Sequence, residues 1–340
     1  MTPRIVKLIA EIDEFKGYWG GMENLSSKTL SSMQILATIE SIGSSTRIEG
    51  AKLSNRQVAE VLDGLDINSF RSRDEQEVAG YARAMQLIHG SFQEIELTEN
   101  NIKYLHKVIM QFSTKDSRHL GEYKKHPNHV AAFDSDGNQI GIIFETATPL
   151  DTPWLMENLV QIAQEGFQDP NLHPLLTIAD FVVRFLAIHP FQDGNGRLSR
   201  ILTNLLLLRN GYGFIRYSSH ERIVEANKDN YYKVLRTSQD KLKSQGDFSI
   251  TWVEFFLELL KKQKDDLKTK IERERKAHQL PELSEKICRL ANDHSRITVA
   301  FITNELQANR NTVKKHLQNL VKNGRLVKHG KGRGAYYSPF

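Results

Sequence analysis

The chain has 340 residues, a formal net charge of +5 and 39% apolar residues. This length exceeds what one hydrophobic core usually organises, so we expect at least two domains. The composition excludes a largely disordered chain, and no run approaches the roughly 18 apolar residues of a membrane span, which excludes a membrane protein.

The first residues, MTPRIVKLIAEIDEF, place charges among apolar side chains, where a secretory signal would need an uninterrupted apolar core. The only cysteine, Cys288, has no partner for a disulfide within the chain. Both observations favour a cytoplasmic protein.

The first third of the chain favours helices. Apolar residues recur there at three- and four-residue spacing, over residues 30–42, 55–65, 75–89 and 101–110. Gly43, Gly50 and Gly90 punctuate these segments.

The pattern changes between His129 and Phe144. Two extended runs, HVAAFD and QIGIIFE, flank Asp136-Gly137-Asn138, whose residue types favour a hairpin turn. Helical spacing returns over residues 154–165, 175–188 and 196–208. Another helix begins at Thr251, and its mixed charges as far as Gln279 predict an exposed helical spacer between two folded units.

Residues 189–200 read HPFQDGNGRLSR and lie between two predicted helices, so His189 falls in a loop. Gly194, Asn195 and Gly196 allow a tight turn and a close approach of the backbone to a ligand. The helix that starts there directs unpaired N–H groups at any bound anion. This geometry is typical of a phosphate site.

Charged side chains complete the same segment. The guanidinium groups of Arg197 and Arg200 match phosphate oxygens, and Asp193 suits a divalent cation shared with a phosphate. His189 can act as a base near neutral pH. Each residue alone has an ordinary structural explanation, but their occurrence together in one segment favours phosphate chemistry.

This segment resembles the signature of the Fic family, which has the same His-Pro-Phe, Gly-Asn-Gly-Arg and final Arg, with an acidic residue where Asp193 stands. The resemblance extends from the helix carrying Glu49 to about Gln239. It implies a mainly α fold, with a helical core and a small β-hairpin flap. It also implies a protein adenylyltransferase, which moves AMP from ATP onto Ser, Thr or Tyr hydroxyls of target proteins and of itself, and releases pyrophosphate.

By that resemblance, His189 takes the proton from the target hydroxyl and Asp193 holds Mg²⁺ against the α- and β-phosphates. Arg197 contacts the inner phosphates, and Arg200 pairs with the γ-phosphate. Asn195 and the flanking glycine amides form the anion cradle, and two tyrosines help to wall the adenosine, with core packing as the alternative for them. The residues expected to bind ATP are Gly194, Asn195, Gly196, Arg197, Arg200, Tyr231 and Tyr232.

A second motif lies upstream, where Ser45, Glu49 and Gly50 fit the inhibitory pattern of the same family. On a helix Ser45 and Glu49 share one face, so the hydroxyl would orient the carboxylate, and Gly50 suits a helix end. The resemblance implies that Glu49 reaches Arg200 and takes the guanidinium that the γ-phosphate needs. An exposed carboxylate without this role is the alternative.

The hairpin corresponds to the flap of the family, which captures a target segment as an added strand. Its expected flap residues are Ile142, Ile143 and Phe144. An ordinary surface hairpin is the alternative.

The last 60 residues carry 11 Lys/Arg against 4 Asp/Glu, which favours an acidic partner. Two helical segments, a Gly-Lys-Gly-Arg-Gly tip and flanking extended runs resemble a winged helix. DNA binding and protein contacts both remain open for it. Its candidate DNA-binding residues are Arg310, Asn311, Thr312, Lys314, Lys315, Lys331 and Arg333.

We therefore expect an N-terminal helical region with the inhibitory helix over residues 1–100, a Fic catalytic core over 101–250, a linker helix over 251–280 and a winged-helix domain over 281–340. A homodimer is expected on general grounds. The alternatives are a DNA-binding regulator whose Fic domain only senses nucleotide, and a Fic enzyme that removes AMP.

Overall fold

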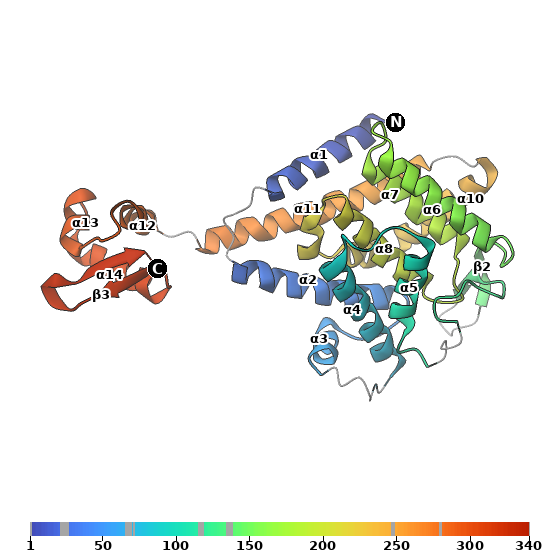
Figure 1. The fold of residues 1–340 in the computed structure, drawn as a ribbon, viewed down its shortest axis with the longest axis horizontal. Helices are drawn as coiled ribbons and strands as arrows, with labels where there is room; N and C mark the ends of the chain where they lie inside the picture. Colours follow the sequence, from blue (N-terminus) through green and yellow to red (C-terminus); the bar gives the residue numbers. More distant parts are fainter. Residues whose placement is uncertain are drawn as a thin grey trace. The chain divides into compact units, whose positions relative to one another are not determined.

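Helices dominate the chain, as the apolar spacing predicts (Figure 1). The computed structural model describes residues 2–20, 27–64, 70, 72–114, 119–133, 139–245, 249–278 and 281–339, with the backbone alone at 27–28, 129–144, 243–245, 275–278 and 333. The chain divides into two compact units, residues 1–269 and 270–340. None of the described helices is both long and apolar enough to cross a membrane.

The first unit contains one β-hairpin among its helices, which confirms the predicted mainly α body. Its elements are α1 (Pro3–Gly20), α2 (Ser27–Ile48), α3 (Asn55–Asp63), α4 (Arg73–Ser91), α5 (Glu99–Met110), β1 (His129–Phe133), β2 (Gln139–Glu145), α6 (Thr152–Gln168), α7 (Pro174–Ile188), α8 (Asn195–Arg209), the 3-10 helix η1 (Gly213–Tyr217), α9 (His220–Ala226), α10 (Lys228–Gln245) and α11 (Ile250–His278), which runs into the second unit.

Helix α8 is the centre of this unit. Nearly every residue from its first turn to Leu208 is buried, including Leu198, Ile201 and Leu205. A helix that is buried on all sides has to be surrounded by others, and α8 packs against α2, α4, α5 and α7. The first turn of α8 is therefore a fixed point on which side chains from several helices converge.

Two expectations about the helices are wrong, one about a helix limit and one about exposure. Gly43 does not interrupt the first long helix; it makes room for the guanidinium of Arg47, which would lie 2.6 Å from an added Cβ, and α2 continues to Ile48. In α11, the stretch expected to be an exposed spacer buries Gln263, Leu267 and Ile271, because these residues recur every four positions and form one inward stripe among the charges.

The hairpin forms where the two extended runs predict it. Strands β1 and β2 are antiparallel, with Val130 opposite Phe144 and Ala131 opposite Ile142. Ile143 is therefore the extra residue of a bulge. The predicted turn, Asp136-Gly137-Asn138, lies outside the described residues.

The second unit consists of α12 (Glu282–His294), α13 (Val299–Glu305), α14 (Arg310–Lys322), β3 (Leu326–His329), a 3-10 turn η2 (Gly332–Gly334) and β4 (Tyr336–Pro339). A small core of its own, which includes Ile287, Ile302, Val313 and Leu317, holds it together. Helices α13 and α14 and the hairpin match the segments expected here, whereas α12 was not predicted, and the winged helix itself stays a prediction.

Candidate functional site

The loop between α7 and α8 is bounded by two left-handed residues. His189 ends α7 with φ 53° and its N–H donates to Phe185 O at 2.9 Å, and Gly194 begins α8 with φ 81°. A left-handed histidine is strained, and such strain persists where the surroundings fix it. The sequence predicted this loop, with the histidine at its start.

Asn195 fixes the shape of the loop. Its Oδ1 accepts from Phe191 N at 2.9 Å and its Nδ2 donates to Phe191 O at 2.7 Å. Asn195 was expected in the anion cradle, and each polar atom of its side chain has a bond to the loop. The backbone N–H of Asn195 is therefore the group best placed to serve the cradle.

His106 braces the loop from α5 and was missed by the sequence analysis. Its ring stacks on Phe191 at 3.9 Å between centroids, and its Nδ1 accepts from Gly121 N at 3.0 Å. The proton therefore lies on Nε2, which donates to Asp193 O at 3.0 Å. The pattern of the sequence marks His106 only as a residue within a helix.

Lys124, Asn128 and Thr146 form a second brace that the sequence analysis missed. Lys124 Nζ donates to Ile188 O at 2.9 Å and to Thr146 Oγ1 at 2.9 Å, while Asn128 Nδ2 donates to Phe191 O at 2.6 Å. Burial lowers the pKa of Lys124 to about 8. Asn128 and Thr146 directly flank the hairpin strands, and this position was the one available signal.

The geometry leaves His189 as a neutral base. Its Nδ1 lies 3.4 Å from Leu186 O, which places the proton on Nδ1 and leaves Nε2 as the acceptor. Burial and the charge of Lys124 lower the pKa of His189 to about 4. The imidazole is therefore unprotonated at neutral pH, as a base has to be.

The second turn of α8 holds Arg200 against the end of α2. The guanidinium is buried; its Nε donates to Ser45 Oγ at 2.8 Å and its NH2 group to Glu49 Oε1 at 2.7 Å. Burial lowers the pKa of Arg200, but the charges of Glu49, Tyr81 and Tyr231 and the hydrogen bond to Glu49 together outweigh it, and the net shift is upward. Glu49 and Arg200 meet as predicted.

Glu49 also covers the start of α8. A Cβ at Gly196 would lie 2.2 Å from Glu49 Oε1, so no larger residue fits there without movement. The carboxylate thus lies at the positive end of the helix, where anions bind. Glu49 follows the end of α2, and Gly50 has φ 108°. The Ser45 hydroxyl accepts from the guanidinium of Arg200, whereas we expected it to orient the carboxylate.

Asp193 and Arg197 belong to a network of charges. Asp193 Oδ1 accepts from Gly194 N at 2.6 Å and from the NH2 group of Arg197 at 3.3 Å. Burial raises the pKa of Asp193, but Arg197, the Gly194 amide and Arg73 outweigh it and lower the pKa overall. Arg197 is buried, its NH1 group lies 3.6 Å from Glu77 Oε2, and its Nε has no hydrogen-bond partner among the described residues.

The site could bind a metal ion only with Asp193 as its main protein ligand. Among the described residues there is no cluster of three or more His, Cys, Asp or Glu side chains that could hold a cation. A cation at the ionised carboxylate of Asp193 would need most of its ligands from water and from a phosphate substrate, which is how Mg²⁺ is often bound.

The two tyrosines lie on α10 behind Arg200. Tyr231 is buried, packs against Trp252 and Phe255 at 6.0 and 6.3 Å between ring centroids, and has its pKa raised to about 12 by burial. Tyr232 meets it edge-on at 5.2 Å. Tyr231 therefore packs in the core, and its interactions with Arg200 and Glu49 also bring it to the candidate site. A role of the two tyrosines at the adenosine stays a prediction. A cavity of about 410 Å³ is lined by Gln239, Ile188 and Thr146, among others.

The remaining candidates belong to the hairpin and to the second unit. The side chains of Ile142, Ile143 and Phe144 are outside the description, as is that of Arg333. On α14 Val313 and Leu317 face the core of the second unit. All of the other candidates are exposed, namely Arg310, Asn311, Thr312, Lys314, Lys315 and Lys331.

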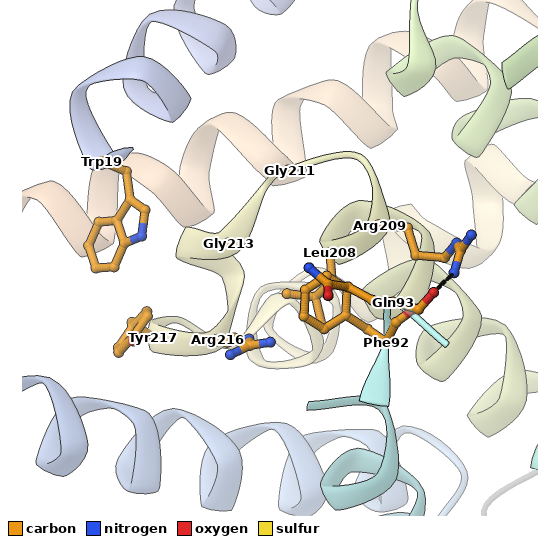
Figure 2. A pocket seen from close by; sticks show the side chains of 9 residues that line it. All are labelled: Trp19, Phe92, Gln93, Leu208, Arg209, Gly211, Gly213, Arg216 and Tyr217. Carbon is orange, nitrogen blue, oxygen red and sulfur yellow. Dashed lines mark hydrogen bonds between the residues drawn. The ribbon is translucent and has the colours of Figure 1, made fainter. Parts of the chain in front are cut away.

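A separate cavity of about 560 Å³ lies among α1, the turn after α4, the end of α8 and η1 (Figure 2). The two arginines that line it have structural roles. Arg209 donates to the main-chain oxygens of Phe92 and Gln93, and Arg216 donates to His89 O and lies over the ring of Phe92. None of the predicted site residues lines this cavity, so the candidate site is the start of α8.

Comparison with known proteins gives the same assignment. Residues 96–207 match the model of the Fic/DOC family. The protein adenylyltransferase Fic of Drosophila grimshawi is 30% identical over 213 residues, which are 62% of this chain and 39% of that protein. The protein of the same name from Drosophila persimilis is 29% identical over 224 residues, 65% of this chain and 39% of that protein. The chain spans about two fifths of the length of these curated relatives.

Solved structures share the fold. A Fic family protein from Desulfovibrio desulfuricans G20 superimposes with a TM-score of 0.64 at 23% identity, covering 100% of this chain and 97% of that one. A Fic domain containing signaling protein from Bacteroides thetaiotaomicron gives a TM-score of 0.58 at 23% identity, covering 78% and 95%. The chain therefore contains a domain of the Fic/DOC family, and this domain includes the loop and the helix that carry residues 189–200.

Proposed function

We propose that this chain is a protein adenylyltransferase, which transfers AMP from ATP to a Ser, Thr or Tyr hydroxyl of a target protein and of itself. The names of its curated relatives support this reaction. The observation that carries it is the start of α8, where the buried guanidinium of Arg200 is held 2.7 Å from a carboxylate oxygen. A site of this kind is built for an anion.

In the proposed reaction, the oxygen of the target hydroxyl attacks the α-phosphorus of ATP. The bond between that phosphorus and the oxygen bridging to the β-phosphorus breaks, and pyrophosphate leaves. Nε2 of His189 takes the hydroxyl proton, while Arg197 and Arg200 stabilise the phosphate charges. Asp193 would hold Mg²⁺, which supplies further neutralisation of the triphosphate when it is bound.

Glu49 inhibits this reaction in cis. Its carboxylate is bonded to Arg200 and fills the position that a Cβ of residue 196 would occupy. A terminal phosphate therefore cannot pair with the same guanidinium. ATP is then excluded or bound in an unproductive pose. The flap would present the target as an added strand, with β1 and β2 supplying the backbone edge.

The test is incubation with cell lysate and either α-labelled or γ-labelled ATP. The Glu49→Gly variant should label proteins from the α position only, and the label should vanish in Glu49→Gly/His189→Ala. Glu94→Gly removes an exposed carboxylate from a turn distant in sequence and is the matched control. Label from the γ position would indicate phosphate transfer instead.

Two alternatives predict other outcomes. An enzyme that removes AMP would release label from modified proteins when ATP is absent. A nucleotide sensor would bind ATP without labelling any protein, itself included.

DNA binding by the second unit is a second candidate function. From Leu306 to Phe340 the chain has 8 Lys/Arg and no Asp or Glu, and the basic side chains of α14 that are described are exposed. A surface of one sign attracts a polyanion. Fluorescence anisotropy with duplex DNA at increasing salt tests this, and affinity that does not fall with salt would favour a protein partner. The cytoplasmic location and the homodimer stay predictions, the latter testable by analytical ultracentrifugation.

A further inference from the structure

Four charged side chains beside the candidate site form a closed ring of alternating sign. Arg73 Nε lies 2.9 Å from Glu77 Oε1, and Glu77 Oε2 lies 3.6 Å from Arg197. Arg197 lies 3.3 Å from Asp193 Oδ1, and Asp193 Oδ2 lies 3.3 Å from the NH2 group of Arg73. Two residues of the predicted ATP and metal site are thus neutralised by a pair from α4.

We propose that Arg73 sets the affinity of this site for a divalent cation, because it occupies the carboxylate oxygen of Asp193 that the cation would take. The inference rests on the proposed function, in which Asp193 is the metal ligand. It adds a residue outside residues 189–200 that determines how easily the metal enters.

The contacts of the two carboxylate oxygens differ. Asp193 Oδ1 already accepts from the Gly194 amide at 2.6 Å and from the buried Arg197. Oδ2 is paired with Arg73, whose side chain is 56% exposed. A divalent cation on Oδ2 would meet the guanidinium as a like charge at close range, so the two compete for that oxygen. Cation binding is therefore easier when Arg73 moves away.

Arg73 can move away from Asp193 and still remain beside the candidate site, because a second residue of α4 holds it. The side chain starts at the first residue of the helix, and Glu77, only 11% exposed and one turn further on, holds its Nε. Arg73 can thus leave Asp193 and stay tethered beside the triphosphate. An exposed ion pair is usually worth less than about 1 kcal/mol, so its loss should tighten cation binding by about two- to fivefold.

The experiment measures Mn²⁺ binding by electron paramagnetic resonance, in the Glu49→Gly background with saturating α,β-methylene-ATP. This analogue keeps the phosphates, but its α–β bridge cannot be cleaved. Arg73→Ala should bind Mn²⁺ about two- to fivefold more tightly than the Glu49→Gly parent. Arg73→Lys, which keeps the charge, should stay near the parent. Arg83→Ala removes the same charge from an exposed position of the same helix and should change nothing.

An unchanged Mn²⁺ affinity in Arg73→Ala would overturn the inference and leave the proposed function standing. Weaker binding would overturn it as well, and would assign Arg73 to the phosphates. If the Glu49→Gly parent binds the analogue but no Mn²⁺, the metal role of Asp193 fails and the inference with it. If the parent binds neither, the proposed function itself fails.

Discussion

Basic residues begin two helices of this molecule, α8 and α14, and their surroundings differ. At the start of α8, Arg197 and Arg200 are 2% and 4% exposed and are held by carboxylates at fixed distances. At the start of α14, Arg310 and Lys314 are exposed, and the chain around them carries no acidic residue.

The difference indicates what each surface can bind. A buried arginine with all its distances fixed favours one anion in one geometry, because moving it costs hydrogen bonds and leaves a charge unpaired. An exposed basic stripe favours a polyanion through charge alone and depends on salt. The predictions below test each half of this comparison, in order of expected effect.

His189→Ala should cause the largest loss. In the Glu49→Gly background, the rate of AMP transfer should fall by roughly 10²–10⁴-fold, because the base is removed while the arginines remain. ATP affinity, measured by calorimetry, should hardly change. A comparable loss of affinity would mean that His189 supports the site rather than the chemistry.

Glu49→Gly should raise AMP transfer by about 10- to 100-fold, the range expected from freeing a hydrogen-bonded charge. Autoradiography with α-labelled ATP measures it. Glu49→Gln keeps the shape and loses the charge, so it should fall in between. Equal rates in all three proteins would refute inhibition by Glu49.

The effect of Gly196→Ala on the free energy of unfolding should depend on whether Glu49 is present opposite it. In the wild type the added Cβ meets Glu49 Oε1 at 2.2 Å, so the free energy of unfolding should drop by roughly 1–3 kcal/mol. In Glu49→Gly the clash is absent, and Ala, a better helix former, should be neutral or stabilising by up to about 1 kcal/mol. Denaturant unfolding of the four proteins measures both, and a cost that is the same in both backgrounds would contradict the geometry.

Lys314→Ala and Lys315→Ala should each weaken duplex binding a few-fold and lower the slope of log affinity against log salt by roughly 1. Lys286→Ala, an exposed lysine of α12 paired with Glu282, is the control. If the control weakens binding as much, the basic stripe on α14 is not the binding surface.

The pH dependence should be the smallest effect. The pKa of His189 is lowered to about 4, so the base stays neutral well below pH 7. The rate of Glu49→Gly between pH 8 and about 5.5 should therefore change by less than about twofold, where an imidazole at the ordinary 6.5 would lose roughly tenfold. A tenfold fall by pH 5.5 would show that His189 titrates normally.

The sequence predicted the parts of the site that a short segment encodes. The left-handed turn at Gly194, the arginines of α8 and their meeting with Glu49 all follow from local patterns and the family resemblance. The hairpin was predicted because alternation and turn residues are local signals as well.

The braces could not be predicted in the same way. His106, Lys124 and Glu77 reach the site from other elements, and nothing in their neighbourhoods distinguishes them from ordinary helix or loop residues. Ser45 was assigned the wrong partner because α2 ends at Ile48, which takes Glu49 out of helical register. These contacts depend on tertiary packing, which the spacing of residues does not encode.

Calorimetric titration of ATP and ADP into the wild type and Glu49→Gly tests the central claim most directly, that Glu49 takes the guanidinium needed by the terminal phosphate. ADP lacks that phosphate, so removing Glu49 should improve ATP affinity clearly more than ADP affinity. Equal gains for both nucleotides, or none for either, would contradict the account.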